Sequence, residues 1–278
     1  EDGIRDGTVT GVQTCALPIC WVGDKINHPA IMKIYPRLET SKFLYHVCEY
    51  IEGQTLTAWL QDNPKPSFVK VRDILDQLIK MLRVLQRQDI IHCDIKGDNF
   101  IIDSHGRLKL IDFGSSHTGA VKDSLKEEKT DQLVFNQGTL NYSAPELFYG
   151  HENSHKSELY SLAVLVYHML TNRLPYKEIN QIEDAPKQFN LWRYKPIVTC
   201  RKDLPKYMDR VMSKALAANP INRYEHYSEF LAEFTISDKI DKNSVANLPL
   251  IERDPVKFWQ GVSGFLLIII FLILFLKT

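Results

Sequence analysis

Apolar and polar positions follow two different periods along the middle of the chain. Residues 43–50 are rich in aromatic and β-preferring side chains and are followed by Glu52-Gly53, which predicts a strand. From Val69 to about Gln88, apolar residues recur at steps of three and four with charges between them, which predicts an amphipathic helix. Short apolar runs separated by polar turns predict further strands at 90–91, 100–102 and 108–111.

The later part of the central region has the helical period throughout. Apolar residues repeat at helical steps from about Ser157, and helices are expected again over 206–216 and 224–234. Strands come early and helices late, which is the order of an α+β domain. Residues 236–257 contain a polar, weakly patterned stretch, and we interpret them as a linker.

The end of the chain is apolar over a length that suits a membrane. Residues 265–276 are all Phe, Leu or Ile, and the run extends back to Phe258 with Gln260 as its strongly polar member. A helix over 258–276 would cover roughly 28 Å, close to the ~30 Å hydrocarbon core of a bilayer. We therefore expect a transmembrane helix, with a buried core helix or a lone hydrophobic tail as the alternatives. Basic residues before the run favour a main body in the cytoplasm.

The first 20 residues differ from the rest in another way. They have no helical period, no strand alternation and no signal-peptide layout. Within them, the stretch VTGVQTCALPI resembles translated sequencing-adapter read-through. We therefore expect residues 1–20 to be a non-native leader, with a short ordered extension as the alternative.

Charge and cysteine content narrow the class of protein. The chain has 34 basic and 34 acidic side chains and a net charge of zero, so no basic excess supports binding to nucleic acid. Its 44% of apolar and 24% of charged residues are ordinary for a folded protein and argue against disorder. The five cysteines are scattered and odd in number, which argues against a disulfide framework and favours a reducing compartment.

Three short motifs stand in order along the central region. Residues 92–99 read His-Cys-Asp-Ile-Lys-Gly-Asp-Asn and lie between two predicted strands. An Asp-Phe-Gly tripeptide begins at Asp112, 13 residues after Asn99, and a Ser-Ala-Pro-Glu sequence ends at Glu146, 32 residues after the tripeptide. The set resembles the catalytic loop, the magnesium loop and the end of the activation segment of eukaryotic-type (Hanks-type) bacterial serine/threonine protein kinases. The resemblance implies a protein-kinase-like α+β domain over residues 21–235.

The resemblance implies chemical roles for five polar residues. Phosphoryl transfer needs positioned reactants and neutralised phosphate charge. Asp94 would hold the substrate hydroxyl and accept its proton, Lys96 would reach the transferring phosphate, and Thr139 matches the threonine that bonds both. Asn99 and Asp112 would bind Mg²⁺, with Mn²⁺ as the alternative ion, because a hard cation takes oxygen ligands. Taken alone, an Asp and an Asn in one loop would more simply be a turn.

Further residues would support this machinery. By resemblance they are His92, Phe113, Gly114, Glu146, Glu158 and Arg223. Glu146 would form a buried ion pair with Arg223 that holds the activation segment to its lobe. Glu158 stands where the family usually has an aspartate that braces the catalytic loop.

The resemblance also implies an ATP site. Cys48 falls at the gatekeeper position, Glu49 and Ile51 fall in the hinge that bonds adenine, and Ile101 would pack beneath the base. We expect Cys48 to be a buried thiol that behaves as a small hydrophobe, with a redox site as the alternative.

The chain departs from the family pattern in several places. It carries no Gly-rich loop, no third-strand lysine and no glutamate of the helix that follows, so we expect a truncated small lobe and negligible kinase activity. Cys93 replaces the usual arginine of the catalytic loop, which argues against control by a phosphorylated activation loop.

A narrower resemblance concerns the C-terminal sequence. Residues 249–261, placed before the apolar run, resemble the membrane-anchored bifunctional serine/threonine kinase/phosphatases of bacteria. This implies a single-pass C-terminal anchor in the bacterial inner membrane, a kinase domain in the cytoplasm and a phosphatase domain ahead of Trp21.

Three hypotheses follow for the function. The first is a kinase fragment whose partners are ATP, a divalent cation and proteins with Ser or Thr hydroxyls. The others are a pseudokinase scaffold and a membrane-attached signalling adaptor. Intact Asp94, Lys96, Asn99 and Asp112 favour the kinase, since a scaffold has no physical need for all four.

Overall fold

The structure is a computed structural model that describes residues 25–35, 47–118, 140–235, 258–260 and 262–264. The chain divides into two units, Glu1–Phe234 and Thr235–Thr278, which are described separately. Within the described residues, no helix is long and apolar enough to cross a membrane, and most of the expected span falls outside them. The expected leader and linker lie outside the described residues as well.

Helix α3 (Phe68–Arg87) begins where Ser67 caps its first turn. Ser67 Oγ accepts the N–H of Lys70 at 3.2 Å, which satisfies one of the donors that a helix leaves unpaired at its start. The predicted amphipathic helix is confirmed to within one residue at each end. Its apolar face is buried and includes Val71, Ile74, Leu75, Leu78, Leu82 and Leu85.

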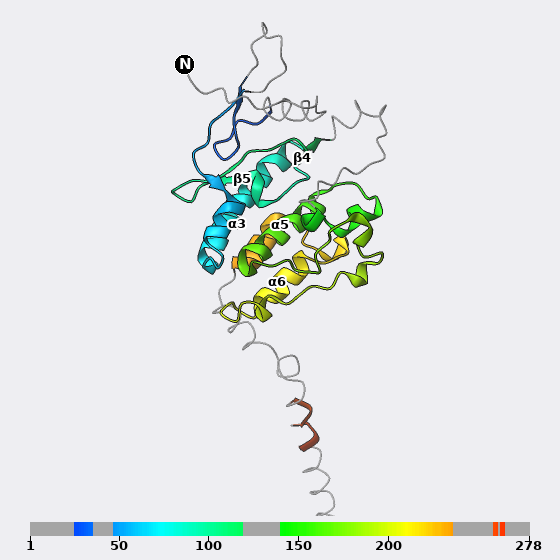
Figure 1. The fold of residues 1–278 in the computed structure, drawn as a ribbon. Coiled ribbons are helices and arrows are strands. Elements are labelled where there is room, and N and C mark those ends of the chain that lie inside the picture. The colour runs from blue at the N-terminus through cyan, green and yellow to red at the C-terminus, as the bar shows by residue number, and fades with distance from the viewer. Residues whose placement is uncertain (1–24, 36–46, 119–139, 236–257, 261, 265–278) are drawn as a thin grey trace, which may run out of the picture. The chain divides into compact units, whose positions relative to one another are not determined.

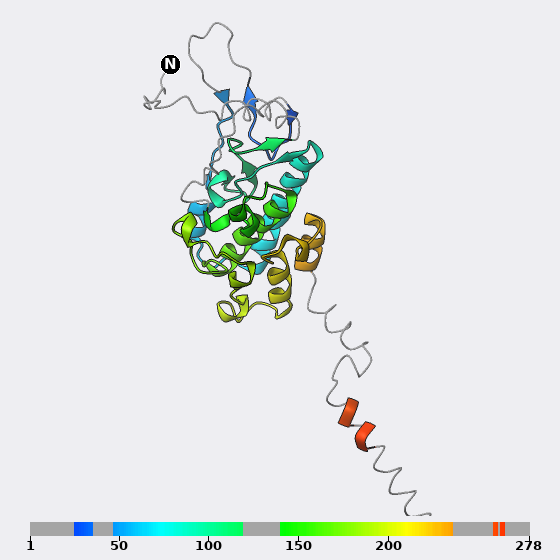
Figure 2. The same cartoon turned by 90° about the vertical axis from the view of Figure 1, so that its right-hand side faces the viewer.

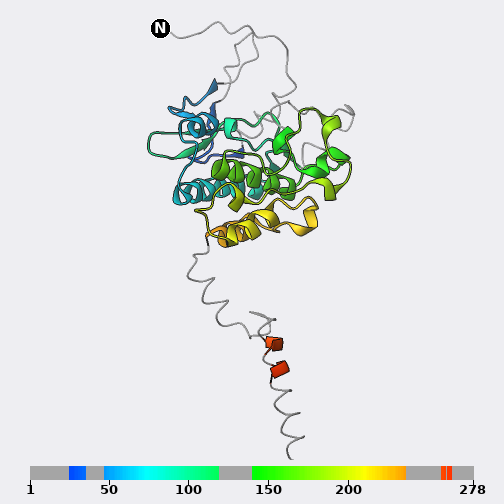
Figure 3. The same cartoon turned by 60° about the horizontal axis from the view of Figure 1, so that its bottom comes forward.

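Helix α5 (His155–Thr171) lies at the centre of the first unit. Ser154 and Ser157 form a capping box, in which each hydroxyl oxygen accepts the backbone N–H of the other residue at 3.2 and 2.8 Å. Most residues of this helix are buried, and a helix that is buried all round must be covered by its neighbours. Helices α3 and α6 (Tyr207–Ala215) pack against it (Figures 1 and 3).

Two further helices lie among the residues that the structure describes in the central region. Helix α7 (Tyr227–Thr235) contacts the start of α3 through Phe234, whose ring centroid lies 5.3 Å from that of Phe68. The helices expected over 206–216 and 224–234 are confirmed as α6 and α7, although α7 begins three residues late. Helix α2 (Leu56–Asp62) was not predicted, and Thr55 caps it by accepting the N–H of Ala58 at 3.2 Å.

The described strands pair antiparallel in small sheets on one side of the helices (Figures 1 and 2). The pairs are β1 (Ile34–Tyr35) with β2 (Val47–Cys48), β3 (Gln54–Thr55) with β5 (Phe100–Ile102), β5 with β6 (Leu108–Leu110), and β4 (Ile90–Ile91) with β7 (His117–Thr118). In the β5–β6 register, Phe100 faces Leu110 and Ile102 faces Leu108, and all four side chains are buried. The opposed pair Ile101 and Lys109 points to the other, partly exposed face.

Short 3₁₀ turns fill the connections. They are η1 (Gly97–Asn99), η2 (Leu140–Tyr142), η3 (Pro145–Tyr149), η4 (Ile182–Asp184), η5 (Phe189–Leu191), η6 (Ile197–Thr199) and η7 (Pro220–Asn222). Turns η1 and η3 carry residues of the first and third predicted motifs, so these two motifs lie partly on turns between regular elements.

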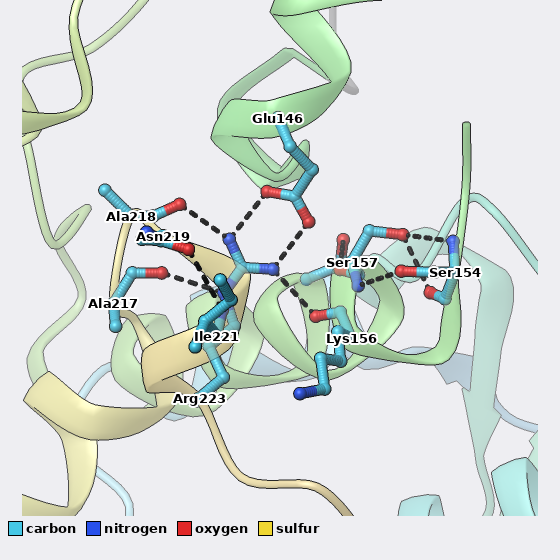
Figure 4. A network of polar contacts seen from close by, with 10 residues as sticks. Glu146, Ser154, Lys156, Ser157, Ala217, Ala218, Asn219, Ile221 and Arg223 are labelled. Atoms are coloured by element: carbon cyan, nitrogen blue, oxygen red, sulfur yellow. Dashed lines mark hydrogen bonds and ion pairs between the residues drawn. The ribbon is translucent and has the colours of Figure 1, made fainter. Parts of the chain in front are cut away.

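Glu146 and Arg223 tie two of these turns together across the surface of α5 (Figure 4). The guanidinium donates to both oxygens of the carboxylate, at 2.7 and 2.6 Å. Its remaining N–H groups donate to the backbone carbonyls of Ala217, Ala218 and Lys156 at 2.8, 3.0 and 2.9 Å. All five N–H groups of Arg223 therefore have an acceptor, as burial of a guanidinium requires.

This ion pair is almost completely shielded from solvent. The side chains of Arg223 and Glu146 are 0% and 6% exposed. The guanidinium carbon of Arg223 also lies 4.7 Å from the ring centroid of Tyr160, on α5. Each ion thus depends on the other, because neither has water to replace a lost partner.

Replacing Arg223 with alanine should lower the free energy of unfolding by about 3–5 kcal/mol, since Glu146 would remain buried without its partner. Chemical denaturation of the 278-residue chain, followed by circular dichroism, measures this loss. Lys156→Ala is the matched control, because its side chain pairs with Glu225 at the surface at 2.7 Å and such pairs contribute at most about 1 kcal/mol. A loss for Arg223→Ala no larger than that of the control would contradict this account.

Candidate functional site

The segment from β4 to β5 brings three of the predicted site residues together. Lys96 Nζ lies 2.7 Å from Asp94 Oδ2, and Asn99 Nδ2 donates to the same oxygen at 3.0 Å. Asn99 Nδ2 also donates to the backbone carbonyl of Asp94 at 2.7 Å. Asp94 is 8% exposed, so these contacts hold its carboxylate in one position at the edge of the core.

Gly97, in the middle of this segment, allows a close approach by helix α2. A Cβ atom at Gly97 would lie 2.5 Å from Thr57 Oγ1 and 3.0 Å from the backbone nitrogen of Thr57. Side chains larger than hydrogen would therefore push the loop away from α2. The absence of a side chain at Gly97 thus lets the loop pack closely against α2, a helix that the apolar periodicity did not predict.

Asn99 and Asp112 are the predicted cation ligands, and their backbones are joined. The N–H of Ile111 donates to the carbonyl of Asn99 at 3.0 Å, which places Asp112 beside the end of the 92–99 loop. Asp112 is exposed, and its Oδ1 accepts the N–H of Gly114 at 2.8 Å. Because Asn99 uses its nitrogen toward Asp94, its oxygen is the atom that can face a cation.

This donor set fits magnesium. Mg²⁺ binds through one or two carboxylates together with substrate phosphates, and it takes oxygen ligands. Among the described residues, no group of three or more His, Cys, Asp or Glu side chains could hold a metal by itself. One carboxylate and one amide oxygen therefore suit an ion that arrives with a phosphate ligand.

His92 and Phe113 form the buried base of the loop. Their ring centroids lie 5.9 Å apart, and both residues are about 1% exposed. Burial lowers the pKa of His92, which favours the neutral imidazole. His92 Nδ1 accepts the N–H of Asp94 at 3.3 Å, so the ring supports the residue that carries the carboxylate.

Glu158, on α5, binds the backbone of the same loop. Its Oε1 accepts the N–H of His92 at 2.6 Å, and its Oε2 accepts the hydroxyl of Tyr227 at 2.5 Å. Tyr227 was not among the predicted residues. It lies 69 positions after Glu158 and outside every motif, so no local pattern pointed to it. Burial and the charge of Glu158 raise the pKa of Tyr227 well above its usual value, which keeps its hydroxyl protonated.

Cys93 connects these supports through a strained backbone. Its φ of 68° lies in the left-handed region, which residues with a side chain rarely adopt. Its Sγ donates to the carbonyl of Ile91 at 3.4 Å. The turn at Cys93 reverses the chain between His92, which Glu158 holds, and Asp94, which Asn99 holds.

The expected adenine site has a described hinge. Glu49 makes two hydrogen bonds with the backbone of Lys33: its N–H donates to the Lys33 carbonyl at 2.8 Å, and its side-chain Oε2 accepts the Lys33 N–H at 3.1 Å. Glu49 Oε1 pairs with Lys109, and this contact lowers the pKa of Glu49. Lys109 lies opposite Ile101 in the β5–β6 register, so the ion pair borders the residue expected beneath adenine. Ile51, further along the hinge, is half-buried.

The expectation that Cys48 is a buried thiol was wrong, because this residue is exposed. The strand that contains it, β2, is paired with β1, and Val47 and Tyr35 on these strands are each 42% exposed as well. A two-stranded ribbon of two residues each provides little surface to cover a side chain. Thr139, the remaining predicted catalytic residue, lies outside the described residues.

Comparison with known proteins agrees with this geometry. A family model described as the protein kinase domain matches residues 20–233. Serine/threonine-protein kinase PrkC of Bacillus subtilis is 27% identical over 222 residues, which are 78% of this chain and 32% of that protein. Serine/threonine-protein kinase PknB of Mycobacterium leprae is 31% identical over 217 residues, or 75% and 33% of the two chains.

A third relative extends the picture. The probable serine/threonine-protein kinase PknB of Lactococcus lactis is 24% identical over 224 residues, or 81% of this chain and 35% of that protein. The chain thus spans about a third of the length of the curated relatives it matches. With the three motifs in order, a joined loop that carries Asp94 and Asn99, and a family match over most of its length, this chain belongs to the protein kinase family.

Proposed function

We propose that this chain carries the phosphoryl-transfer machinery of a serine/threonine kinase, which moves the terminal phosphate of ATP to Ser or Thr hydroxyls of proteins. The observation that carries the proposal is the joint hold of Lys96 and Asn99 on one carboxylate oxygen of Asp94. The names of the three relatives support the serine/threonine class.

Each residue has a role that its chemistry permits. Asp94 would receive the proton of the substrate hydroxyl as the oxygen attacks phosphorus, a contribution of about 10²–10⁴ in rate for general-base catalysis. Lys96, 2.7 Å from Asp94, would place a positive charge beside the phosphoryl group in transfer. Asn99 would position Asp94 through its amide nitrogen. Thr139 is proposed to bond Asp94 and Lys96.

A divalent cation, Mg²⁺ or Mn²⁺, would neutralise phosphate charge when bound. Asn99 and Asp112 are the residues that would hold it. The adenine would bind at the hinge of Glu49 and Ile51, over Ile101 and beside Cys48. Glu146, Arg223, Glu158, His92, Phe113 and Gly114 would support the loop and the activation segment rather than touch the substrate.

Replacing Asp94 with asparagine should lower kcat by about 10²–10⁴, because the amide cannot accept the hydroxyl proton. The measurement is transfer from labelled ATP to a Ser/Thr substrate, in a chain restored with a Gly-rich loop, a strand lysine and a helix glutamate ahead of Trp21. Asp89→Asn is the control, since Asp89 lies in the left-handed region that asparagine tolerates and outside the Asp94 cluster. Turnover retained by Asp94→Asn would overturn the assignment, and a folded restored chain without any transfer would favour the pseudokinase scaffold.

The 278-residue chain by itself should show negligible transfer. Its sequence carries no Gly-rich loop, lysine and glutamate in the family pattern, and both charges are needed to place the ATP phosphates. The test is incubation of the purified chain with labelled ATP, a divalent cation and a Ser/Thr substrate. Transfer that the Asp94→Asn variant abolishes would contradict this prediction.

We also propose that residues 258–276 anchor the protein in the bacterial inner membrane with its kinase domain in the cytoplasm. The alternative is a membrane-attached signalling adaptor, which the same residues would hold at the membrane. The apolar sequence of the run supports this. Removing residues 258–278 should move the protein from carbonate-washed membranes to the soluble fraction. Trp259→Ala, which leaves the run apolar, is the control. Retention of the shortened chain on membranes would contradict the anchor.

We further propose that a phosphatase domain precedes Trp21 in the native protein. The resemblance of residues 249–261 to the bifunctional kinase/phosphatases supports this. The DNA upstream of the Trp21 codon would reveal a phosphatase domain, a Gly-rich loop and the two charged residues of the small lobe together.

A further inference from the structure

Glu158 receives one hydrogen bond from the catalytic loop and another from a helix near the end of the domain. We propose that Tyr227, on α7, is a positioning residue: its hydroxyl fixes Glu158, and Glu158 holds the turn that aims Asp94. The inference rests on the proposed function for its catalytic meaning. The contacts themselves are the His92 N–H to Oε1 at 2.6 Å and the Tyr227 hydroxyl to Oε2 at 2.5 Å.

The burial of Glu158 makes the second contact necessary. Its side chain is 1% exposed, so water does not solvate the carboxylate. His155 Nδ1 lies 4.0 Å from Oε2, beyond hydrogen-bond distance. Tyr227 therefore supplies the short, charge-assisted bond to that oxygen. A buried carboxylate oxygen without a donor would turn toward another one and would take Oε1 with it.

The length of glutamate explains why one anchor is not enough. Glutamate has one more rotatable bond than aspartate, so a single hydrogen bond leaves more orientations of its carboxylate open. Two donors, one on each oxygen, reduce these to one. The hydroxyl of Tyr227 thus compensates for the extra methylene of Glu158 where the family usually has aspartate.

The turn at Cys93 is what this anchor has to stabilise. A left-handed residue with a side chain persists only where its surroundings hold it. The Cys93 turn is held on one side by Glu158, through the N–H of His92, and on the other by Asn99, through the carbonyl of Asp94. Loosening the first hold should let the turn relax and move the Asp94 carboxylate.

Tyr224 provides a matched control for the loss of a hydroxyl. It is fully buried, and its hydroxyl donates to a carboxylate oxygen of Glu233 at 3.0 Å. Glu233 pairs with Lys214 and Arg210 and makes no described contact with the 92–99 loop. Tyr224→Phe therefore removes the same atom from the same kind of bond without touching the catalytic loop.

The first test measures amide hydrogen exchange in the 278-residue chain. In Tyr227→Phe, the His92 amide should exchange about three- to tenfold faster than in the parent, the factor expected for the loss of one net hydrogen bond. In Tyr224→Phe, the His92 amide should exchange as in the parent. Peptide mapping should also show faster alkylation of Cys93 in Tyr227→Phe alone, with Cys200 as the internal reference. Equal exchange and alkylation in both variants would overturn the proposal.

The second test asks whether Tyr227 acts through Glu158. In a Glu158→Gln background, Tyr227→Phe should add little further exchange at His92, because the oriented carboxylate is already gone. Independent, multiplying effects of the two substitutions would overturn the proposal. Glu158→Gln keeps the shape of the side chain, so it also reports on the loop if Tyr227→Phe fails to fold.

The third test separates positioning from general stability. In the restored chain described above, Tyr227→Phe should lower kcat about tenfold or less while the KM for ATP stays unchanged, and Tyr224→Phe should change neither. A rise in KM with unchanged kcat would overturn the positioning role. If the restored parent transfers no phosphate, the proposed function fails, whereas the exchange tests still decide whether Tyr227 holds the loop.

Discussion

Two buried carboxylates, Glu146 and Glu158, determine how the functional loops attach to the core. A carboxylate taken out of water destabilises the fold unless donors replace its hydration. Glu146 obtains two donors from the guanidinium of Arg223, which in turn needs the carbonyls of three other residues. Each carboxylate therefore has one stable arrangement, and the turn or loop bonded to it is fixed by the same requirement.

The two carboxylates act on different segments by the same principle. Glu146 lies on η3 and fixes the end of the third motif, whereas Glu158 lies on α5 and fixes the loop of the first. Helix α5 is central to both, because the carbonyl of Lys156 accepts from Arg223 only two residues before Glu158. Among the described helices, the largely buried α5 thus carries polar groups on which the loops depend, and its apolar packing keeps water away from them.

The sequence predicted the helices well and the small strands only in part. Helices α3, α5, α6 and α7 have apolar residues at a clear helical period, and each was found close to its expected range. Helix α2, with seven residues, is too short for such a period to stand out. Cys48 lies on a strand as predicted, but the burial expected from its gatekeeper position was wrong, because a short two-stranded ribbon need not be covered.

The same limit applies to the site. Asp94, Lys96 and Asn99 lie within a few residues of one another, so their meeting could be expected from the motif alone. Tyr227 and Glu158 are distant in sequence, and their contact depends on how α7 packs beside α5. A hydroxyl that serves a buried carboxylate leaves no local pattern, since any tyrosine on an apolar helix face looks like core. Residues that meet only in the folded chain, such as Tyr227 and Glu158, can be recognised only once the donors to each buried carboxylate are identified.

Asn99 shows how closely the candidate functions of the loop are coupled. Its amide nitrogen bonds the carbonyl and the carboxylate of Asp94, and this orientation leaves its oxygen for a cation. Its own backbone carbonyl accepts the N–H of Ile111, next to Asp112. Asn99, itself one proposed cation ligand, thus connects the proposed base Asp94 to the residue before the other ligand, Asp112. A displacement of Asp94 would therefore also change the cation site, and for this reason the hold of Glu158 on the far side of the loop bears on more than the base alone.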